Sequence, residues 1–539
     1  MQEKTYLGVM LDASRNAVMS VEGLKRFIDT IQKMGYNCLQ LYTEDTYEID
    51  GEPLFGYLRG RYTKAELKEI DTYAKEHGVE MMPCIQTLAH LNQIFQFPKY
   101  DEVKDLADIL LVGEEKTYQL IEKMFQTFSE CFSSRHIHIG MDEAHFLGLG
   151  KYLDRNGYQN RFDVLLGHLK RVCDIAEKYG YQPMMWSDMF FRLAFHGDYY
   201  KKNGVIPEEV KQKVPKNIEL VYWDYYNTDK ELCESMMDNH LSFNRKVWFF
   251  GGAWKWCGFN SGNQFSFDTT KPTLEVCQEK GVKNVLITMW GDNGNESPAY
   301  CVLPALMYAA ECYRGNFDLA KTKEKFESLF GESWDDFMLL DFPMPKEVKR
   351  MCEVASGAKE MLYNDYFVGK FDYMVSEEGY EGKRYKELSE KLSEAAMRSK
   401  NYGYIFHSYA KLCNVLSVKY DLGYRTRKAY QAGDKGALKS LVNDYQTVLA
   451  GLDEFLKEFR KMWFYDNKPH GFDVQDIRIG GVIARTNSCM ARLKAYIDGE
   501  TDKIEELEET IVDYYTGGEP SREMTDKNLY SILATVNIL

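Results

Sequence analysis

Short apolar runs rich in β-forming residues alternate with longer stretches of helical periodicity up to about residue 315. This alternation is typical of repeated βα units. About eight such runs can be placed, and eight is the number that closes a barrel. The sequence therefore predicts an α/β fold, a TIM (β/α)8 barrel. Its expected strands are Tyr6–Asp12, Tyr36–Tyr42, Val79–Gln86, His136–Glu143, Tyr181–Asp188, Ile218–Tyr225, Lys246–Trp254 and Asn284–Asp292.

The stretches between the strands carry signals for both ends of a helix. Residues 20–35 and 63–78 each open with Ser or Thr and close with Gly, which satisfies the unpaired N–H and C=O groups of the helix ends. After about residue 320 the strand signal fades and long amphipathic patterns replace it. We therefore predict a barrel domain over residues 1–320 and an α-helical C-terminal domain over residues 321–539.

The charge balance excludes some classes of partner. The chain has 82 acidic and 67 basic residues and a net charge of −15, which would repel a nucleic acid backbone and an anionic bilayer. No segment approaches about 18 uninterrupted apolar residues, so we expect no membrane span. The given start lacks the pattern of a signal peptide, and the 12 cysteines are scattered; we therefore expect a cytoplasmic location and reduced thiols.

Polar or aromatic side chains follow nearly every expected strand. In a parallel barrel all strand carboxyl ends open on one face, which carries the active site. Residues far apart in the sequence therefore converge on that face. They are Asp12 and Arg15, Tyr42 with Glu44 and Asp45, Gln86 with His90, Asp142 with Glu143, Trp186 with Asp188, Trp223 with Tyr225, Trp254, and Trp290 with Asp292.

The adjacent carboxylates Asp142 and Glu143 carry the strongest chemical signal. Successive side chains of a strand point to opposite faces, so the strand must end at this pair. The two carboxylates of an ordinary retaining glycosidase lie on opposite sides of the scissile bond, about 5 Å apart, whereas sequence neighbours approach from one side. Such a pair suits substrate-assisted hydrolysis, in which the 2-acetamido group of the sugar attacks its own anomeric carbon. Glu143 would be the general acid and base, and Asp142 would orient the acetamide and stabilise the oxazolinium.

The segment HIHIGMDEAH, residues 136–145, resembles the H-x-G-x-D-E signature of family 20 β-N-acetylhexosaminidases, with His138 as a supporting residue. The resemblance implies an exo-acting glycoside hydrolase that releases terminal GlcNAc or GalNAc with retention of configuration. Its partner would be a glycan or oligosaccharide with a terminal N-acetylhexosamine, and no cofactor or metal is implied.

Other barrel segments are similar to the same family. In PCIQTLAH, His90 falls on the histidine that supports the carboxylates, although the usual Glu, Asp and Pro-Gly are replaced. LDASR places Arg15 on the arginine that holds sugar hydroxyls, and WDYY places Tyr225 on the tyrosine that hydrogen-bonds the acetamide carbonyl.

The same resemblance supplies the expected walls of the sugar pocket. In MWGD, Trp290 would form its floor and Asp292 would bind a sugar hydroxyl; because Asp replaces the more common Glu, Glu296 is the alternative. Trp186 and Trp254 would enclose the N-acetyl group together with Trp290, and Trp223 is a further substrate-binding candidate.

Two other functions stay open at this point. A metal-dependent hydrolase would use His136, His138 and His145 near Asp142, although a cation at Arg15 disfavours a metal. A non-catalytic sugar-binding protein would keep the aromatic pocket, although the acid is present. The helical part, which is similar to that of a bacterial subgroup of the family, would complete the pocket or form a homodimer interface. The sequence does not distinguish GlcNAc from GalNAc, or one linkage from another.

Overall fold

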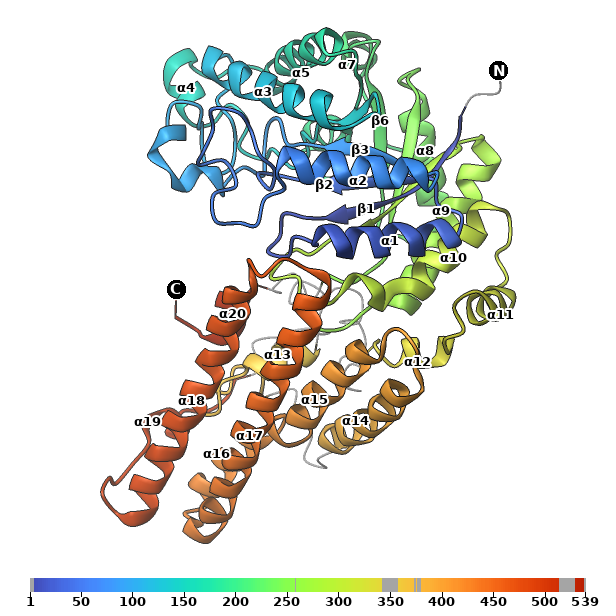
Figure 1. Ribbon diagram of the computed structural model, residues 1–539. Coiled ribbons are helices and arrows are strands. Elements are labelled where there is room, and N and C mark those ends of the chain that lie inside the picture. The colour runs from blue at the N-terminus through green and yellow to red at the C-terminus, as the bar shows by residue number, and fades with distance from the viewer. Residues whose placement is uncertain are drawn as a thin grey trace. The chain divides into compact units, whose positions relative to one another are not determined.

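The computed structural model describes residues 4–256, 258–341, 357–372, 375, 380–512 and 529–537. It confirms the expected fold class, because eight parallel strands close a barrel in sequence order and helices form the C-terminal part (Figure 1). Each strand lies inside its expected run. The strands are β1 Tyr6–Asp12, β2 Cys38–Tyr42, β3 Glu80–Cys84, β4 His136–His138, β5 Gln182–Trp186, β6 Glu219–Trp223, β7 Val247–Gly252 and β8 Asn284–Met289.

The helix ends follow the expected capping chemistry. The Ser20 side chain accepts a hydrogen bond from the backbone of Gly23, and Thr63 forms a reciprocal capping box with Glu66. The helices of the first part of the chain are α1 Val21–Lys33, α2 Lys64–Glu76, α3 Glu115–Cys131, α4 Lys151–Asn156, α5 Arg161–Lys178, α6 Asp188–Ala194, α7 Glu208–Lys213, α8 Lys230–Leu241, α9 Asn263–Lys280 and α10 Leu303–Tyr313.

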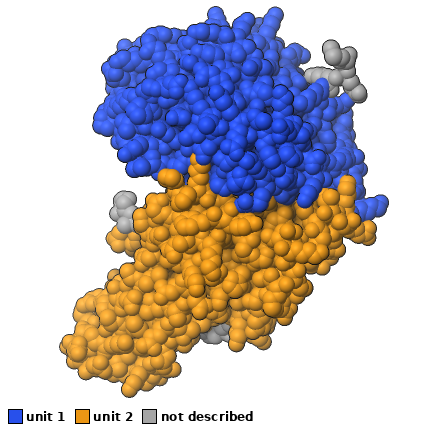
Figure 2. Space-filling model, viewed as in Figure 1, with its two compact units in different colours: residues 1–253, 266–290, 305–322 blue, residues 254–265, 291–304, 323–539 orange. Residues whose placement is uncertain are grey.

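The chain forms two compact units whose segments alternate along the sequence (Figure 2). Unit 1 comprises Met1–Ala253, Ser266–Trp290 and Ala305–Thr322 and contains all eight strands. Unit 2 comprises Trp254–Phe265, Gly291–Pro304 and Lys323–Leu539. The loops that follow β7 and β8 therefore belong to unit 2, although the strands that carry them belong to unit 1.

Unit 2 is built from long helices. Helix α15 packs against α14 and α17, and α17 packs against α18. The loop after β7 joins this core, because the Phe259 ring contacts Phe455 and Phe459. No helix of the described ranges has the length and apolar character needed to cross a membrane. The later helices are α11 Leu319–Phe330, α12 Trp334–Met338, α13 Gly357–Tyr363, α14 Tyr380–Arg398, α15 Gly403–Lys419, α16 Leu422–Gln431, α17 Lys435–Asp466, α18 Phe472–Asp498, α19 Glu505–Glu508 and α20 Tyr530–Ala534.

Candidate active site

A tight turn follows β4 and carries the paired carboxylates. Gly140, Met141 and Glu143 have φ angles of 71°, 72° and 49°. Two of these residues have a side chain, and such residues rarely adopt positive φ, so the turn stores strain of the kind found at functional sites. At Gly140 a Cβ atom would lie 2.0 Å from Gln86 Oε1, so the close approach of Gln86 requires glycine there.

Both carboxylates lie near one histidine. His90 Nε2 is 3.1 Å from Asp142 Oδ2 and 4.0 Å from Glu143 Oε2. Burial opposes a charge on His90, but Asp142 outweighs burial and raises the His90 pKa to about 9. Burial likewise opposes ionisation of Asp142, yet His90 and a hydrogen bond from Gln86 Nε2 (2.9 Å) lower its pKa to about 2. Asp142 is therefore a carboxylate and His90 an imidazolium at neutral pH.

Glu143 is held from its other side by Asp188 and Arg192. The Glu143 backbone N–H donates to Asp188 Oδ2 (3.1 Å), and Arg192 pairs with Glu143 Oε1 (3.4 Å) and with Asp188 Oδ2 (3.1 Å). Burial and the charges of Asp142 and Glu143 raise the Asp188 pKa to about 7. The Glu143 side chain is 41% exposed and the Asp142 side chain 13%, so Glu143 is the more accessible of the two carboxylates.

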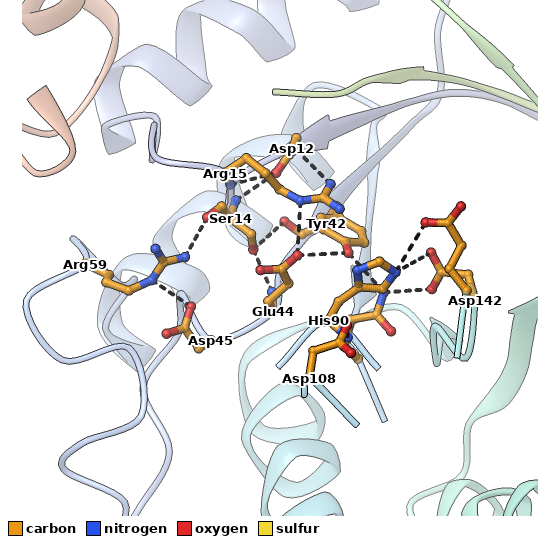
Figure 3. A network of polar contacts seen from close by, with 12 residues as sticks. Asp12, Ser14, Arg15, Tyr42, Glu44, Asp45, Arg59, His90, Asp108 and Asp142 are labelled. Carbon is orange, nitrogen blue, oxygen red and sulfur yellow. Dashed lines mark hydrogen bonds and ion pairs between the residues drawn. The ribbon is translucent and has the colours of Figure 1, made fainter. Parts of the chain in front are cut away.

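A chain of polar contacts links Arg15 to Asp142, as Figure 3 shows. Arg15 Nε lies 3.1 Å from Glu44 Oε1, and the Tyr42 hydroxyl donates to the same oxygen (3.2 Å). Gln86 Nε2 donates to the Tyr42 hydroxyl (3.0 Å) as well as to Asp142. Arg15, which is expected to hold sugar hydroxyls, and Asp142, which is expected to orient the acetamide, thus belong to one network in unit 1.

Asp12 fixes the backbone on which Arg15 stands. Asp12 Oδ1 accepts from the backbone N–H groups of Ser14 (2.9 Å) and Arg15 (3.1 Å), and Asp12 Oδ2 lies 3.1 Å from the guanidinium. The guanidinium also lies 4.7 Å from the Tyr42 ring centre and 5.1 Å from the Trp290 ring centre. These contacts preorganise Arg15 before a ligand arrives.

Four of the expected aromatic residues form one cluster in unit 1. Trp290 lies 6.0 Å from Trp186 and 6.4 Å from Tyr225, and Trp223 stacks on Tyr225 at 5.2 Å. Burial raises the Tyr225 pKa well above its usual value, so this phenol stays protonated and can donate a hydrogen bond.

His138 supports the turn from within unit 1. Its Nδ1 accepts the Gly140 backbone N–H (3.0 Å), and its ring lies 4.4 Å from Trp186. Burial lowers the His138 pKa to about 3, so the ring is neutral with its proton on Nε2.

The remaining expected residues lie in unit 2. Trp254 is buried and stacks on Trp256 at 4.1 Å, and Asp292 is exposed. The Glu296 side chain is 1% exposed and pairs with Lys359 (2.8 Å) and Arg478 (3.2 Å). Two cations, the buried Lys359 and the partly buried Arg478, therefore already contact the Glu296 carboxylate.

The metal alternative finds a different set of ligands from the one expected. Within the described residues, the cluster able to hold a metal is His90, Asp142 and Glu143, whereas His136 lies 3.7 Å from Glu80. A metal ligand must be a neutral imidazole, and the raised pKa of His90 keeps its ring protonated at neutral pH. A metal ion would therefore have to displace a proton from His90 before it could bind there.

Some residues of the site were not assigned a role from the sequence. Asp188 was placed at a strand end without a role, and Arg192 was not singled out. Asp188 and Arg192 are four residues apart on α6, and side chains at that spacing lie on one face of a helix. This spacing could have indicated that the two residues pair.

A parallel barrel whose strand ends gather a carboxylate pair is an architecture found among glycoside hydrolases. Comparison with known families matches residues 5–297 to the model described as "Glycosyl hydrolase family 20, catalytic domain" and residues 335–526 to the "Glycoside Hydrolase 20C C-terminal domain". The first match spans more than half of the chain. The chain therefore belongs to glycosyl hydrolase family 20.

Curated relatives share part of the chain. Hexosaminidase D of Homo sapiens is 25% identical over 220 residues, which cover 39% of this chain and 43% of the human protein. Hexosaminidase D of Bos taurus is 24% identical over 214 residues, which cover 38% of this chain and 58% of the bovine protein. The chain thus spans about half the length of these relatives.

Among solved structures, the chitobiase of Flavobacterium johnsoniae is similar to this chain, with a TM-score of 0.48 and 15% sequence identity. The match covers 85% of this chain and 78% of the chitobiase chain.

Proposed function

We propose that this protein is an exo-acting β-N-acetylhexosaminidase that releases terminal GlcNAc or GalNAc from glycans by a retaining, substrate-assisted mechanism. The observation that carries the proposal is the contact of one imidazolium, His90, with two carboxylates adjacent in sequence. This contact supports an arrangement in which both carboxylates approach the sugar from the same side. The names of the curated relatives agree with the proposal.

The two carboxylates have different roles in the proposed reaction. Ionised Asp142 accepts the acetamide N–H and turns the carbonyl oxygen toward the anomeric carbon. As that oxygen bonds to the anomeric carbon and the glycosidic bond breaks, Glu143 gives its proton to the leaving oxygen. Asp142 then faces the positive charge of the oxazolinium. Water then attacks the anomeric carbon from the vacated side while Glu143 takes its proton. The bond between the anomeric carbon and the former carbonyl oxygen breaks, which restores the acetamide, and the two inversions retain the configuration.

The surrounding side chains select the sugar. Tyr225 donates to the acetamide carbonyl, while Trp223 and Trp290 cover the apolar surface of the sugar and its N-acetyl methyl. Trp186 is 1% exposed and packs against Trp290, so it supports this wall from within unit 1. Burying that surface is worth about 25 cal/mol per Å², which disfavours sugars without an acetamide. Arg15 binds sugar hydroxyls. The roles of Trp254 and Asp292 stay predictions, as do the homodimer and the cytoplasmic location.

Release of 4-nitrophenol tests the activity. We expect hydrolysis of 4-nitrophenyl N-acetyl-β-glucosaminide and little hydrolysis of the matching β-glucoside, which lacks the acetamide. Glu143→Gln should lower turnover on poor leaving groups by about 10²- to 10⁴-fold. Glu177→Gln, an exposed substitution on α5, is the matched control. Equal turnover of the two sugars, or normal activity of Glu143→Gln, contradicts the proposal.

A thiazoline analogue of the oxazolinium tests the role of Asp142. Asp142→Asn should weaken binding of the thiazoline more than binding of the product sugar, because the intermediate carries a positive charge and the product sugar is neutral. Asp174→Asn, at an exposed position of α5, is the control. Equal losses of affinity for both ligands would argue against substrate assistance by Asp142.

A further inference from the structure

A cavity of about 670 Å³ opens in unit 1 beyond the turn that carries Glu143. Its lining includes Arg161, Arg192, His145 and His196, and none of the described residues that line it is Asp or Glu. This volume falls in the range of small-molecule sites, about 300–1,000 Å³. The chain has a net charge of −15, yet the described lining of this cavity combines two arginines with neutral polar and apolar residues and contains no carboxylate.

The cavity adjoins Glu143, the proposed proton donor. Its wall residue Arg192 contacts Glu143 Oε1 at 3.4 Å, and Glu143 is the group that protonates the leaving oxygen. His145 follows Glu143 by two residues and lines the same wall. A group joined to an oxygen that Glu143 protonates would therefore have this cavity beside it.

Arg161 supplies a positive charge that no carboxylate neutralises. It begins α5, and its Nε and Nη2 groups donate to the backbone carbonyls of Leu147 (3.2 Å) and His145 (2.7 Å). Carbonyls orient a guanidinium without cancelling its charge, and across the described ranges Arg161 forms no ion pair with Asp or Glu. Arg155, on the neighbouring α4, is paired with Glu114 at 3.0 Å instead.

Two further features of the cavity fit a charged sugar. Partial burial, followed by the positive charge of Arg192, lowers the pKa of His145, and Arg161 also contributes to this shift. Tyr158, which is 73% exposed, gives the cavity an aromatic face on which a ring can lie.

We propose that this cavity binds the residue on the leaving-group side of the scissile bond, and that Arg161 selects leaving groups that carry an anion such as a carboxylate or a sulfate. The inference rests on the proposed function and names the substrate class of that site. The leaving group enters with its anion against the free edge of the Arg161 guanidinium, and its ring lies along Tyr158.

A matched pair of substrates tests the selection. The 3-carboxyphenyl and 3-carbamoylphenyl N-acetyl-β-glucosaminides have the same shape and differ in the charge of one group. We expect kcat/KM to be about tenfold higher for the carboxylate, as one charge-assisted hydrogen bond allows. In about 0.5 M NaCl this ratio should fall, because salt screens a partly exposed charge.

Substitutions assign the selection to Arg161. Arg161→Gln should bring the ratio close to one, Arg161→Lys should keep part of it, and Arg155→Gln should leave it unchanged. The ratio is the readout because Arg161 also holds the loop after Glu143, so both absolute rates fall together. If Arg161→Gln does not fold, the salt dependence of the wild-type ratio decides the question.

The outcomes separate the two proposals. If neither glycoside nor the 4-nitrophenyl substrate is hydrolysed, the proposed function fails. If the neutral and anionic glycosides are hydrolysed equally well, the hydrolase stands and the selection by Arg161 is refuted. Sodium sulfate provides a further test, because a free sulfate ion could occupy the cavity. If sulfate changes the hydrolysis of both glycosides by the same factor, the cavity holds a free anion and the selection by Arg161 is also refuted.

Discussion

The buried charge cluster around Glu296 gives a prediction that separates a structural role from a sugar-binding role. Glu296 and Lys359 each have side chains 1% exposed, and Arg478 is 12% exposed. Glu296→Gln keeps the size of the side chain and removes its charge. Two cations would then be left in unit 2 without the carboxylate that neutralises them.

The expected cost follows from the burial of these groups. Removing one partner of a buried ion pair costs about 3–5 kcal/mol. For a unit of 150–250 residues each kcal/mol shifts the unfolding temperature by about 2–4 °C, so we expect a decrease of roughly 10 °C. The cluster also holds the loop after β8, because Lys359 and Arg478 both donate to the Asn293 carbonyl (2.8 and 2.9 Å).

Differential scanning calorimetry at a fixed scan rate measures this shift. Glu394→Gln is the control, because Glu394 is 63% exposed and pairs with Arg398 on the surface, where an ion pair contributes about 0–1 kcal/mol. The double variant Glu296→Gln with Lys359→Met should recover part of the lost stability, since it also removes the buried positive charge that Glu296 faces. A Glu296→Gln protein as stable as the wild type, with KM raised tenfold or more, would refute this reasoning and assign Glu296 to the sugar.

Three further perturbations test the site. The raised pKa of His90 means that its protonation stabilises the fold fully below about pH 6.5 and that this contribution is lost as the pH rises through about 9. The free energy of unfolding, measured with urea, should therefore fall over this pH interval more in the wild type than in His90→Gln. Identical slopes against pH in the two proteins would contradict the ion pair. Gly140→Ala should cost about 1–3 kcal/mol and lower kcat by displacing Gln86, whereas Gly180→Ala, with a φ of 70° and open space at its Cβ, controls for backbone strain alone. Activity should survive dialysis against EDTA, because His90 already neutralises Asp142; a loss that zinc restores would support a metal-dependent hydrolase.

The periodic features of the fold could be predicted from the sequence. Strand β1 coincides with its expected run, and β2 begins at Cys38, two residues after the expected start. Strand β4 ends at His138, well before the carboxylates, because the chain adopts positive φ from Gly140. Gly140 is a sequence signal for a turn with positive φ. Met141 gives no such signal, since residues with a side chain seldom adopt positive φ.

Contacts between distant residues could not be predicted from local patterns. Glu296 pairs with Arg478, which lies 182 residues further along the chain. Periodicity describes the face of one helix and does not indicate which residue of another helix it meets. The contact between Arg192 and Glu143 is missing from the prediction for the same reason, because it depends on the exact conformation of the turn after β4.

The alternation of the two units along the chain limits how the protein can be shortened or recombined. A version that ends near residue 322 would keep the loops after β7 and β8 but lose what they pack on. Phe259 would lose Phe455 and Phe459, and the backbone of Asn263 would lose the carboxylate of Asp341 (2.9 Å). Exchange of the C-terminal helices between homologues therefore requires both loops to be transplanted with them.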